Sequence, residues 1–204
     1  MGRRNQHSRA ELKDMALRAA AEIVEAQGSA ALGMREVARR IGYTVGSMYM
    51  IFTNLDDLIV HLNEQTVTEL QRSLEQVANK SHDPAHRLRL MSAAYLGFAL
   101  LHTHRWRLVF EHRLPVGQKA PASYRGHTEA IFALVRDALE QLQASNPPGA
   151  TETLATALWS GVHGICMLAV TGKLQVGGRA SVQALIDVLL DRLLHADGAT
   201  PSRQ

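Results

Sequence analysis

The sequence predicts an all-α protein, with a three-helix head followed by a larger helical domain and about nine helices in all. The composition is the first reason, because hydrophobic residues make up 46% of the chain and aromatic residues only 5%. Periodicity is the second, since apolar residues recur at helical spacing and no segment alternates as a strand would. With 204 residues, the chain can bury an adequate core as one domain or as two small ones.

The first predicted helix covers residues 8–27. Ser8 and Glu11 have the spacing of a capping box, in which each side chain bonds the backbone of the other residue. Apolar residues then follow at i, i+3, i+4 and i+7 from Leu12 to Val24, and Gly28 ends the helix. We expect this helix to pack on the next two and to complete the head.

Residues 34–58 predict two short helices joined by a tight turn, which must therefore cross steeply. Gly42 can end the first helix because glycine adopts positive φ without strain, and Thr44 can cap the second. Met48 and Phe52 provide an inward apolar face. This is the geometry of a helix-turn-helix, in which the N-terminal part of the second helix reads the major groove of DNA.

The same stretch carries a family resemblance. Its pattern is Met34-Arg35-Glu36-Val37-Ala38, Gly42, Gly46-Ser47-Met48-Tyr49, Phe52 and Leu58. It resembles the TetR family of transcriptional regulators. The resemblance implies a DNA-binding domain over residues 1–53 and a ligand-binding and dimerisation domain over residues 54–204. The chain departs from the family at Leu55, where a lysine is common, so one phosphate contact is missing or is supplied elsewhere.

The formal net charge is +3. A charge of this size is compatible with a nucleic-acid partner but does not by itself indicate one. Three arginines within the first ten residues, with no acid among them, predict a basic arm; a solvated terminus is the alternative. Val45 or Met50 is expected to touch a thymine methyl group, and the polar residues to reach phosphates or base edges. The predicted DNA-binding residues are Arg3, Arg4, Arg35, Thr44, Val45, Gly46, Ser47, Tyr49 and Met50.

A long fourth helix is predicted from the cap Asn54 over about 26 residues, roughly 39 Å at 1.5 Å per residue, enough to link two domains. Residues 80–84 interrupt it, and Asp83-Pro84 begins the next helix. The remaining predicted elements are a helix from 84, a short helical piece at 106–110, helices at 124–142, 151–171 and 181–195, loops at 115–121 and 146–149, a turn at 177–178 and a disordered end at 197–204.

The last two helices are apolar on more than one face, which predicts a four-helix interface between two copies of the chain. Gly161 and Gly164 would let a second helix approach closely. An ordinary intrachain core is the alternative. The predicted dimerisation residues are Gly161, Gly164, Leu168, Leu185, Leu189 and Leu193.

Two segments of the predicted second domain resemble one TetR subgroup. Residues 159–164 (WSGVHG) are similar to its Trp-His-Gly motif, and residues 104–110 (HRWRLVF) to the segment it places over its pocket. Aromatic walls with few polar groups suit a mostly hydrophobic molecule held by one or two hydrogen bonds. His163 is either such a group or a buried structural histidine. The predicted ligand-binding residues are Tyr95, Phe98, Trp106, Phe110, His112, Tyr124, Trp159, His163 and Met167.

The sequence shows no motif typical of an enzyme, a metal-binding protein or a membrane protein. No catalytic residue, cofactor or metal site is predicted, since no nucleophile elbow or phosphate-cradling loop occurs and the histidine pairs 82/86 and 102/104 lack partner ligands. The single Cys166 excludes an intrachain disulfide and fits a reducing cytoplasm. Residues 155–170 are too short and too interrupted to span a membrane and predict a buried helix.

The sequence therefore predicts a cytoplasmic, ligand-responsive regulator, most simply a repressor. It would bind a palindromic double-stranded DNA operator as a homodimer and be released by a small hydrophobic effector. The alternative is a helical small-molecule-binding protein or enzyme that no longer binds DNA. Met50, Ile51 and Leu55 favour it, because they are apolar where the family often has polar contacts.

Overall fold

The computed structural model describes residues 7–114, 117, 119–142, 149–174 and 181–194. Nine α-helices and one short 3-10 turn, η1 (Ser29–Ala31), account for the fold of this part, which contains no strand, so the predicted all-α class is confirmed. The helices are α1 (Arg9–Gln27), α2 (Met34–Ile41), α3 (Val45–Tyr49), α4 (Leu55–Ala78), α5 (Pro84–Leu101), α6 (Thr103–Glu111), α7 (Ala122–Leu142), α8 (Ala150–Val170) and α9 (Val182–Leu194).

The chain forms two compact units. The first takes in the residues up to Glu69 together with His102–Arg125, and the second takes in Leu70–Leu101 together with the residues from Gly126 onward. Both α4 and α7 contribute residues to each unit. The predicted domain boundary between residues 53 and 54 concerns function rather than compactness, and it stays a prediction.

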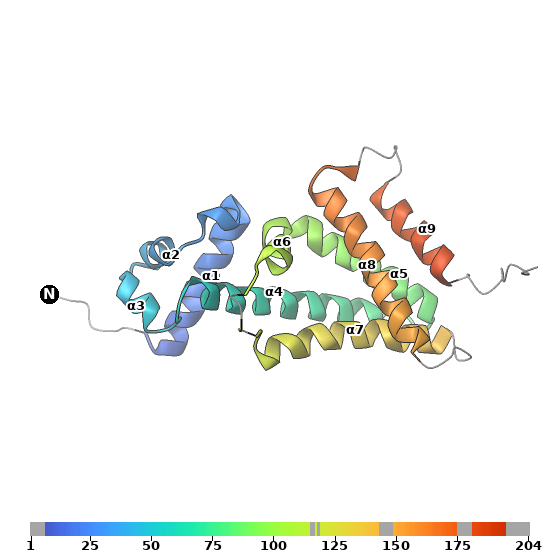
Figure 1. Cartoon of the computed structure of the whole chain (residues 1–204), viewed down its shortest axis with the longest axis horizontal. Coiled ribbons are helices and arrows are strands. Elements are labelled where there is room, and N and C mark those ends of the chain that lie inside the picture. The colour runs from blue at the N-terminus through green and yellow to red at the C-terminus, as the bar shows by residue number, and fades with distance from the viewer. Residues whose placement is uncertain (1–6, 115–116, 118, 143–148, 175–180, 195–204) are drawn as a thin grey trace, which may run out of the picture. The chain divides into compact units, whose positions relative to one another are not determined.

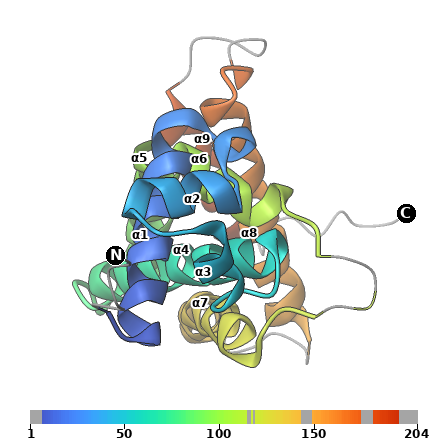
Figure 2. The ribbon, with the colours of Figure 1, turned by 90° about the vertical axis from the view of Figure 1, so that its left-hand side faces the viewer.

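In the first unit, α1 begins as predicted. Ser8 Oγ accepts a hydrogen bond from the Glu11 backbone N–H at 3.2 Å, and the Glu11 carboxylate accepts one from the Ser8 N–H at 2.7 Å. Leu12, Ala16 and Ile23 turn inward from this helix and are buried. Helices α1, α2 and α3 group together in both views of the molecule (Figures 1 and 2).

The turn between α2 and α3 follows the chemistry expected of its residues. Gly42 adopts the left-handed conformation at φ 74°, and its N–H bonds carbonyls of the last turn of α2. Thr44 caps α3, its side chain accepting from the Ser47 N–H. Met48 and Phe52 are completely buried in the head core.

Helix α6 also contributes to that core, which the sequence did not indicate. Its Leu108 is buried among the residues of α1 to α4, and Asn63 of α4 donates a hydrogen bond to the Leu108 carbonyl at 3.4 Å. The helix is longer than the piece predicted at 106–110.

Helix α4 is capped by Asn54, whose Oδ1 accepts from the Asp57 N–H at 2.8 Å, and its 24 residues give a rod of roughly 36 Å. Helix α5 begins at Pro84, with the Asp83 carboxylate capping its first turn. Both starts agree with the predictions. The predicted loop at 146–149, the turn at 177–178 and the end at 197–204 lie wholly or largely outside the described residues.

In the second unit, α8 and α9 lie side by side (Figure 1). The prediction that α8 is a buried helix is wrong. Only 22% of its most apolar window is buried, and by length and composition alone the helix could cross a membrane, which is weak evidence of a membrane span. Ala155, Leu158 and Val162 face inward, because one apolar face suffices for the packing within the unit. Cys166 is buried as well, and the other residues of α8 are half-buried or exposed in the single chain.

Candidate nucleic-acid interface and ligand cavity

The outward end of α3 is the candidate DNA-reading surface. Thr44, Gly46, Tyr49 and Met50 are exposed there, whereas Met48 points into the core. Val45 and Ser47 are half-buried. A Cβ added to Gly46 would meet only Thr44 Oγ1, at an ordinary 3.6 Å, so packing within the chain does not require glycine. The predicted recognition residues thus gather on one exposed end of the helix.

Two hydroxyls of this surface are already engaged. Thr44 Oγ1 accepts from the Ser47 N–H at 3.2 Å and lies 3.0 Å from Ser47 Oγ, so one of the two hydroxyls donates to the other. Only one O–H of the pair remains for DNA. Thr44→Ala would therefore remove a helix cap as well as a DNA-facing group, at a cost of about 1 kcal/mol in stability.

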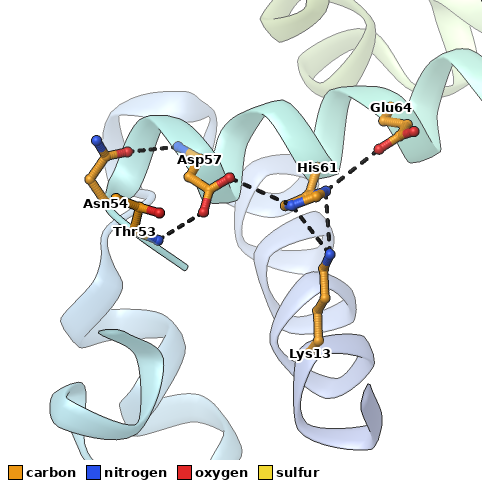
Figure 3. Close-up of polar contacts among 6 residues, drawn as sticks. All are labelled: Lys13, Thr53, Asn54, Asp57, His61 and Glu64. Atoms are coloured by element: carbon orange, nitrogen blue, oxygen red, sulfur yellow. Dashed lines mark hydrogen bonds and ion pairs between the residues drawn. The ribbon is translucent and has the colours of Figure 1, made fainter. Parts of the chain in front are cut away.

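A polar network holds residues 41–53, the recognition segment, to α4 and holds α4 to α1 (Figure 3). The Thr53 N–H donates to the Asp57 carboxylate at 2.8 Å. His61 lies between Asp57 and Glu64, 3.5 Å from an oxygen of each, and its Nε2 is 3.2 Å from Lys13 Nζ of α1. Because the network joins residues of α1 and α4 that are far apart in the sequence, only the Asn54 cap could be predicted from the sequence.

Cations near α3 differ in their freedom to meet phosphates. Arg39 pairs with Glu36 at 2.6 Å and Arg40 with Glu22 at 3.3 Å. Arg35 is exposed, and the described part of the chain shows no ion pair for it. The predicted contacts Arg3 and Arg4 lie outside the described residues.

The end of the basic arm is tied to the helix-turn-helix. His7 Nδ1 lies 2.7 Å from the Tyr43 hydroxyl in the turn between α2 and α3. Sequence reasoning missed this bond, since the two residues are distant along the chain. It places the point where the arm leaves the head next to the candidate DNA-reading surface.

Removing residues 2–6, while keeping His7, should weaken binding to all DNA sequences about equally. The slope of log affinity against log salt should fall by about 0.9 for each phosphate that Arg3 and Arg4 neutralise in the parent protein. Anisotropy titrations of labelled duplex at several salt concentrations measure this slope. An Arg3→Gln/Arg4→Gln chain of full length is the matched control. An unchanged slope would show that the arm makes no phosphate contact.

The second unit contains an apolar cavity of about 410 Å³, part of it open to solvent. Aliphatic side chains dominate its wall, and the Ser92 and Tyr95 hydroxyls and the Trp159 indole are the groups in it able to hydrogen-bond. The lining residues are Leu74 of α4, Leu88, Met91, Ser92 and Tyr95 of α5, Ile131 and Val135 of α7, and Leu158, Trp159 and Val162 of α8.

His163 stands behind this wall and orients two of its aromatic residues. Its Nδ1 lies 2.9 Å from the Tyr95 hydroxyl, and its ring stacks on Trp159 at a centroid distance of 5.1 Å. Burial lowers the pKa of His163, so the imidazole is neutral at pH 7 and can accept from or donate to Tyr95. Phe132 of α7 packs on Trp159, with the ring centroids 5.6 Å apart.

The other predicted ligand-binding residues are distributed differently. Phe98 and Met167 belong to the second unit but do not line the described cavity. Trp106, Phe110, His112 and Tyr124 belong to the first unit, where Trp106 packs edge-on against Phe110 at 5.2 Å. His112 Nε2 lies 2.9 Å from the Asp56 carboxylate of α4.

Most of the cavity wall was missed from the sequence. Aliphatic residues at helical spacing, such as Leu74 and Leu88, look the same whether they line a cavity or fill a core. No sequence signal distinguishes the two cases, because the empty space depends on how four helices are spaced.

Two family models match this chain. The one described as bacterial regulatory proteins, tetR family, matches residues 16–62, and the one described as tetracyclin repressor-like, C-terminal domain, matches residues 88–193. The chain belongs to the TetR family. It is therefore a transcriptional regulator with a DNA-binding helix-turn-helix head and a ligand-binding C-terminal domain. The predicted family is confirmed, and the Trp-His-Gly subgroup stays a prediction.

Known proteins resemble this chain in sequence or in fold. The transcriptional activator FasR of Mycolicibacterium smegmatis is 27% identical over 139 residues, which are 68% of this chain and 64% of FasR. A Rhodococcus protein of unknown function superposes with a TM-score of 0.78 at 23% identity, covering 96% of this chain and 98% of that one. FadR of Bacillus subtilis, solved in complex with stearoyl-CoA, superposes with a TM-score of 0.68 at 13% identity. The match covers 89% of this chain and 97% of FadR.

One predicted dimerisation contact of this TetR-family chain is made within the chain instead. A Cβ at Gly161 would lie 2.5 Å from Leu189 Cδ2, so this glycine allows α8 and α9 of one chain to approach. Gly164 has no atom within 4 Å of the corresponding position. Leu168, Leu185 and Leu193 keep their predicted role as proposals.

The histidine pairs do not form a metal site in the described part of the chain. No group of three or more His, Cys, Asp or Glu side chains there is arranged to hold a metal ion. In this part, His102 pairs instead with Glu25 and His112 with Asp56, each at 2.9 Å.

Acidification should destabilise the protein partly through His163. Burial lowers its pKa in the folded state, whereas in the unfolded chain the ring takes up a proton near pH 6.5. Below that pH the unfolded state therefore binds more protons, and stability falls as pH decreases towards the folded-state pKa. Urea unfolding measures this effect. Between pH 7.5 and pH 5.5, the free energy of unfolding should fall less for His163→Gln than for the parent. Equal losses would contradict this role.

Proposed function

We propose that this TetR-family chain is a repressor that binds a palindromic operator as a homodimer and is released by a small, mostly hydrophobic effector. The observation that carries the proposal is the continuity of α4. Near its start, Asp57 is bonded to Thr53 of the recognition segment, and near its end Leu74 lines the cavity. A ligand that changes the tilt of this helix changes the position of the head. DNA and ligand then oppose each other reciprocally.

The buried part of the effector is uncharged. The described cavity wall holds no charged residue, and Arg87, Arg89 and Arg136 of the same unit each pair with carboxylates. An ion placed among aliphatic side chains without a partner would be strongly disfavoured. Ser92 and Tyr95 can hold one hydroxyl or carbonyl of the ligand.

The FadR neighbour makes an acyl chain the first candidate for this uncharged part. That protein was solved with stearoyl-CoA, although the likeness at 13% identity concerns the fold. An acyl chain is apolar and slender, which suits the aliphatic wall, while a charged carrier group would stay outside it.

The homodimer is supported by the uncovered apolar surface of α8 and α9. Leu168 is 45% exposed and Val188 is 58% exposed in the single chain. A two-fold pair of heads would present two recognition helices about one turn of DNA apart, which is why a palindrome is expected. DNA as the partner places the protein in the cytoplasm, and the proposal requires neither a cofactor nor a metal.

Binding to the DNA upstream of the chain's own coding sequence tests the proposal. The parent protein should bind it specifically at two salt concentrations, and stearoyl-CoA or another long-chain acyl compound should lower the affinity. Val162→Phe, which fills the cavity, should keep DNA binding and lose the response. Ala157→Phe, on the exposed side of α8, is the matched control and should behave as the parent.

The sign of regulation needs a separate measurement, since FasR is named an activator. Deletion of the gene should raise transcription from the bound promoter. A fall in transcription would make the protein an activator.

The rival function is ligand binding without DNA binding, and the exposed apolar Met50 favours it. Such a protein would bind the acyl compound but none of the upstream DNA at either salt concentration. That pattern would replace the present proposal.

A further inference from the structure

The recognition segment lacks the side chains that usually read bases. From Ile41 to Thr53 the sequence contains no charged and no amide side chain. Bidentate contacts to guanine or adenine need Arg, Lys, Asn or Gln, and acceptance from cytosine needs Asp or Glu. The segment that enters the major groove can make none of these pairs.

The hydroxyl groups of the segment replace only some of the hydrogen bonds that charged and amide side chains would make to bases. Thr44 and Ser47 bond each other at 3.0 Å, and Thr44 also caps α3, which leaves one O–H of the pair for DNA. The Tyr49 hydroxyl lies at the far end of a long side chain, so we expect it to bond a phosphate of the DNA backbone. Polar readout of the bases is therefore limited.

Met50 is the most prominent apolar group on this surface, with 71% of its area exposed. It continues the helical conformation of α3 at φ −75° and ψ −19°. It thus shares a face with Gly46, four residues earlier. Gly46 has no side chain on that face, and a Cβ there would meet only Thr44 Oγ1, at 3.6 Å. Three residues after Met50, the Thr53 N–H is fixed to Asp57, which holds the segment in place.

We infer that Met50 determines operator specificity by packing on 5-methyl groups of thymine in the major groove. The methyl is the only apolar group that a base pair presents there, and it distinguishes thymine from the other bases. A methionine side chain is flexible and polarisable, so it can follow the position of the methyl. This inference rests on the proposed operator binding and names the residue that reads the sequence.

Deoxyuridine replaces thymine without its methyl group and so isolates the contact. In duplexes carrying the operator, thymines are replaced one at a time, and affinity is measured by anisotropy at fixed salt. Removal of the methyl that Met50 touches should weaken binding about four-fold for one half-site and roughly fifteen-fold for both. Other thymine positions should change little.

Variants connect the effect to Met50. Met50→Ala should bind thymine and deoxyuridine duplexes equally at the sensitive positions, whereas Met50→Leu, which keeps an apolar side chain, should still distinguish them. Because Met50 is exposed, both variants should unfold at the parent's temperature. Equal binding of every substituted duplex by the parent, or undiminished discrimination by Met50→Ala, would overturn the inference. Failure of the parent to bind the unsubstituted operator would overturn the proposed function, and this inference with it.

Discussion

Replacing Trp106 by alanine should lower the free energy of unfolding by about 3–5 kcal/mol, the range found when a buried aromatic residue is removed. Trp106 is 1% exposed and packs within the first unit against Phe110 of the same helix. Its neighbour Leu108 completes the head core. The variant should therefore lose DNA binding through loss of the folded head, not through loss of ligand.

Phe110→Ala is the matched control for this prediction. Phe110 is 38% exposed, so its truncation should cost less than that of Trp106. Urea unfolding at one fixed protein concentration compares the variants, because the stability of a dimer depends on concentration. If Trp106→Ala kept the stability of the parent and lost only the ligand response, Trp106 would belong to the effector wall as the sequence predicted.

Local signals explain why the head could be predicted from its sequence. The Ser8–Glu11 capping box, the left-handed Gly42 and the Thr44 cap each involve residues a few positions apart. Backbone chemistry at such short range has few alternatives. The same holds for Asp83-Pro84 at the start of α5.

Long-range packing explains what could not be predicted. The sequence placed Gly161 at a dimer contact, whereas its free space is taken by Leu189 of the same chain. It placed Trp106 in a pocket wall, whereas the residue is buried in the first unit. In both cases the type of residue was informative, but its partner depends on how distant helices meet. The hydrogen bond between the Thr44 and Ser47 side chains was also not predicted. It engages hydroxyl groups that were expected to contact DNA.

Introducing carboxylates at the uncovered apolar face of α8 and α9 should convert the dimer to a monomer. In Leu168→Glu/Val188→Glu, each substitution places a charge on a side chain that is exposed in the single chain. An unpaired charge buried in the proposed interface would cost about 3 kcal/mol or more, so association should weaken by more than ~100-fold. Sedimentation at micromolar concentration should give a dimer for the parent and a monomer for the variant. Operator affinity should fall with it, because one head meets only one half-site.

The two glycines of α8 provide the sharpest control for this interface. Gly164→Leu adds a side chain where the chain itself has no atom within 4 Å, so the single chain should tolerate it and only the dimer should weaken. Gly161→Leu forces Leu189 away and should cost about 1–3 kcal/mol of stability even in a monomer. Leu101→Glu, on an exposed leucine of α5, should leave both properties unchanged. A parent protein that sediments as a monomer, or a Gly164→Leu variant as tightly dimeric as the parent, would place the interface elsewhere.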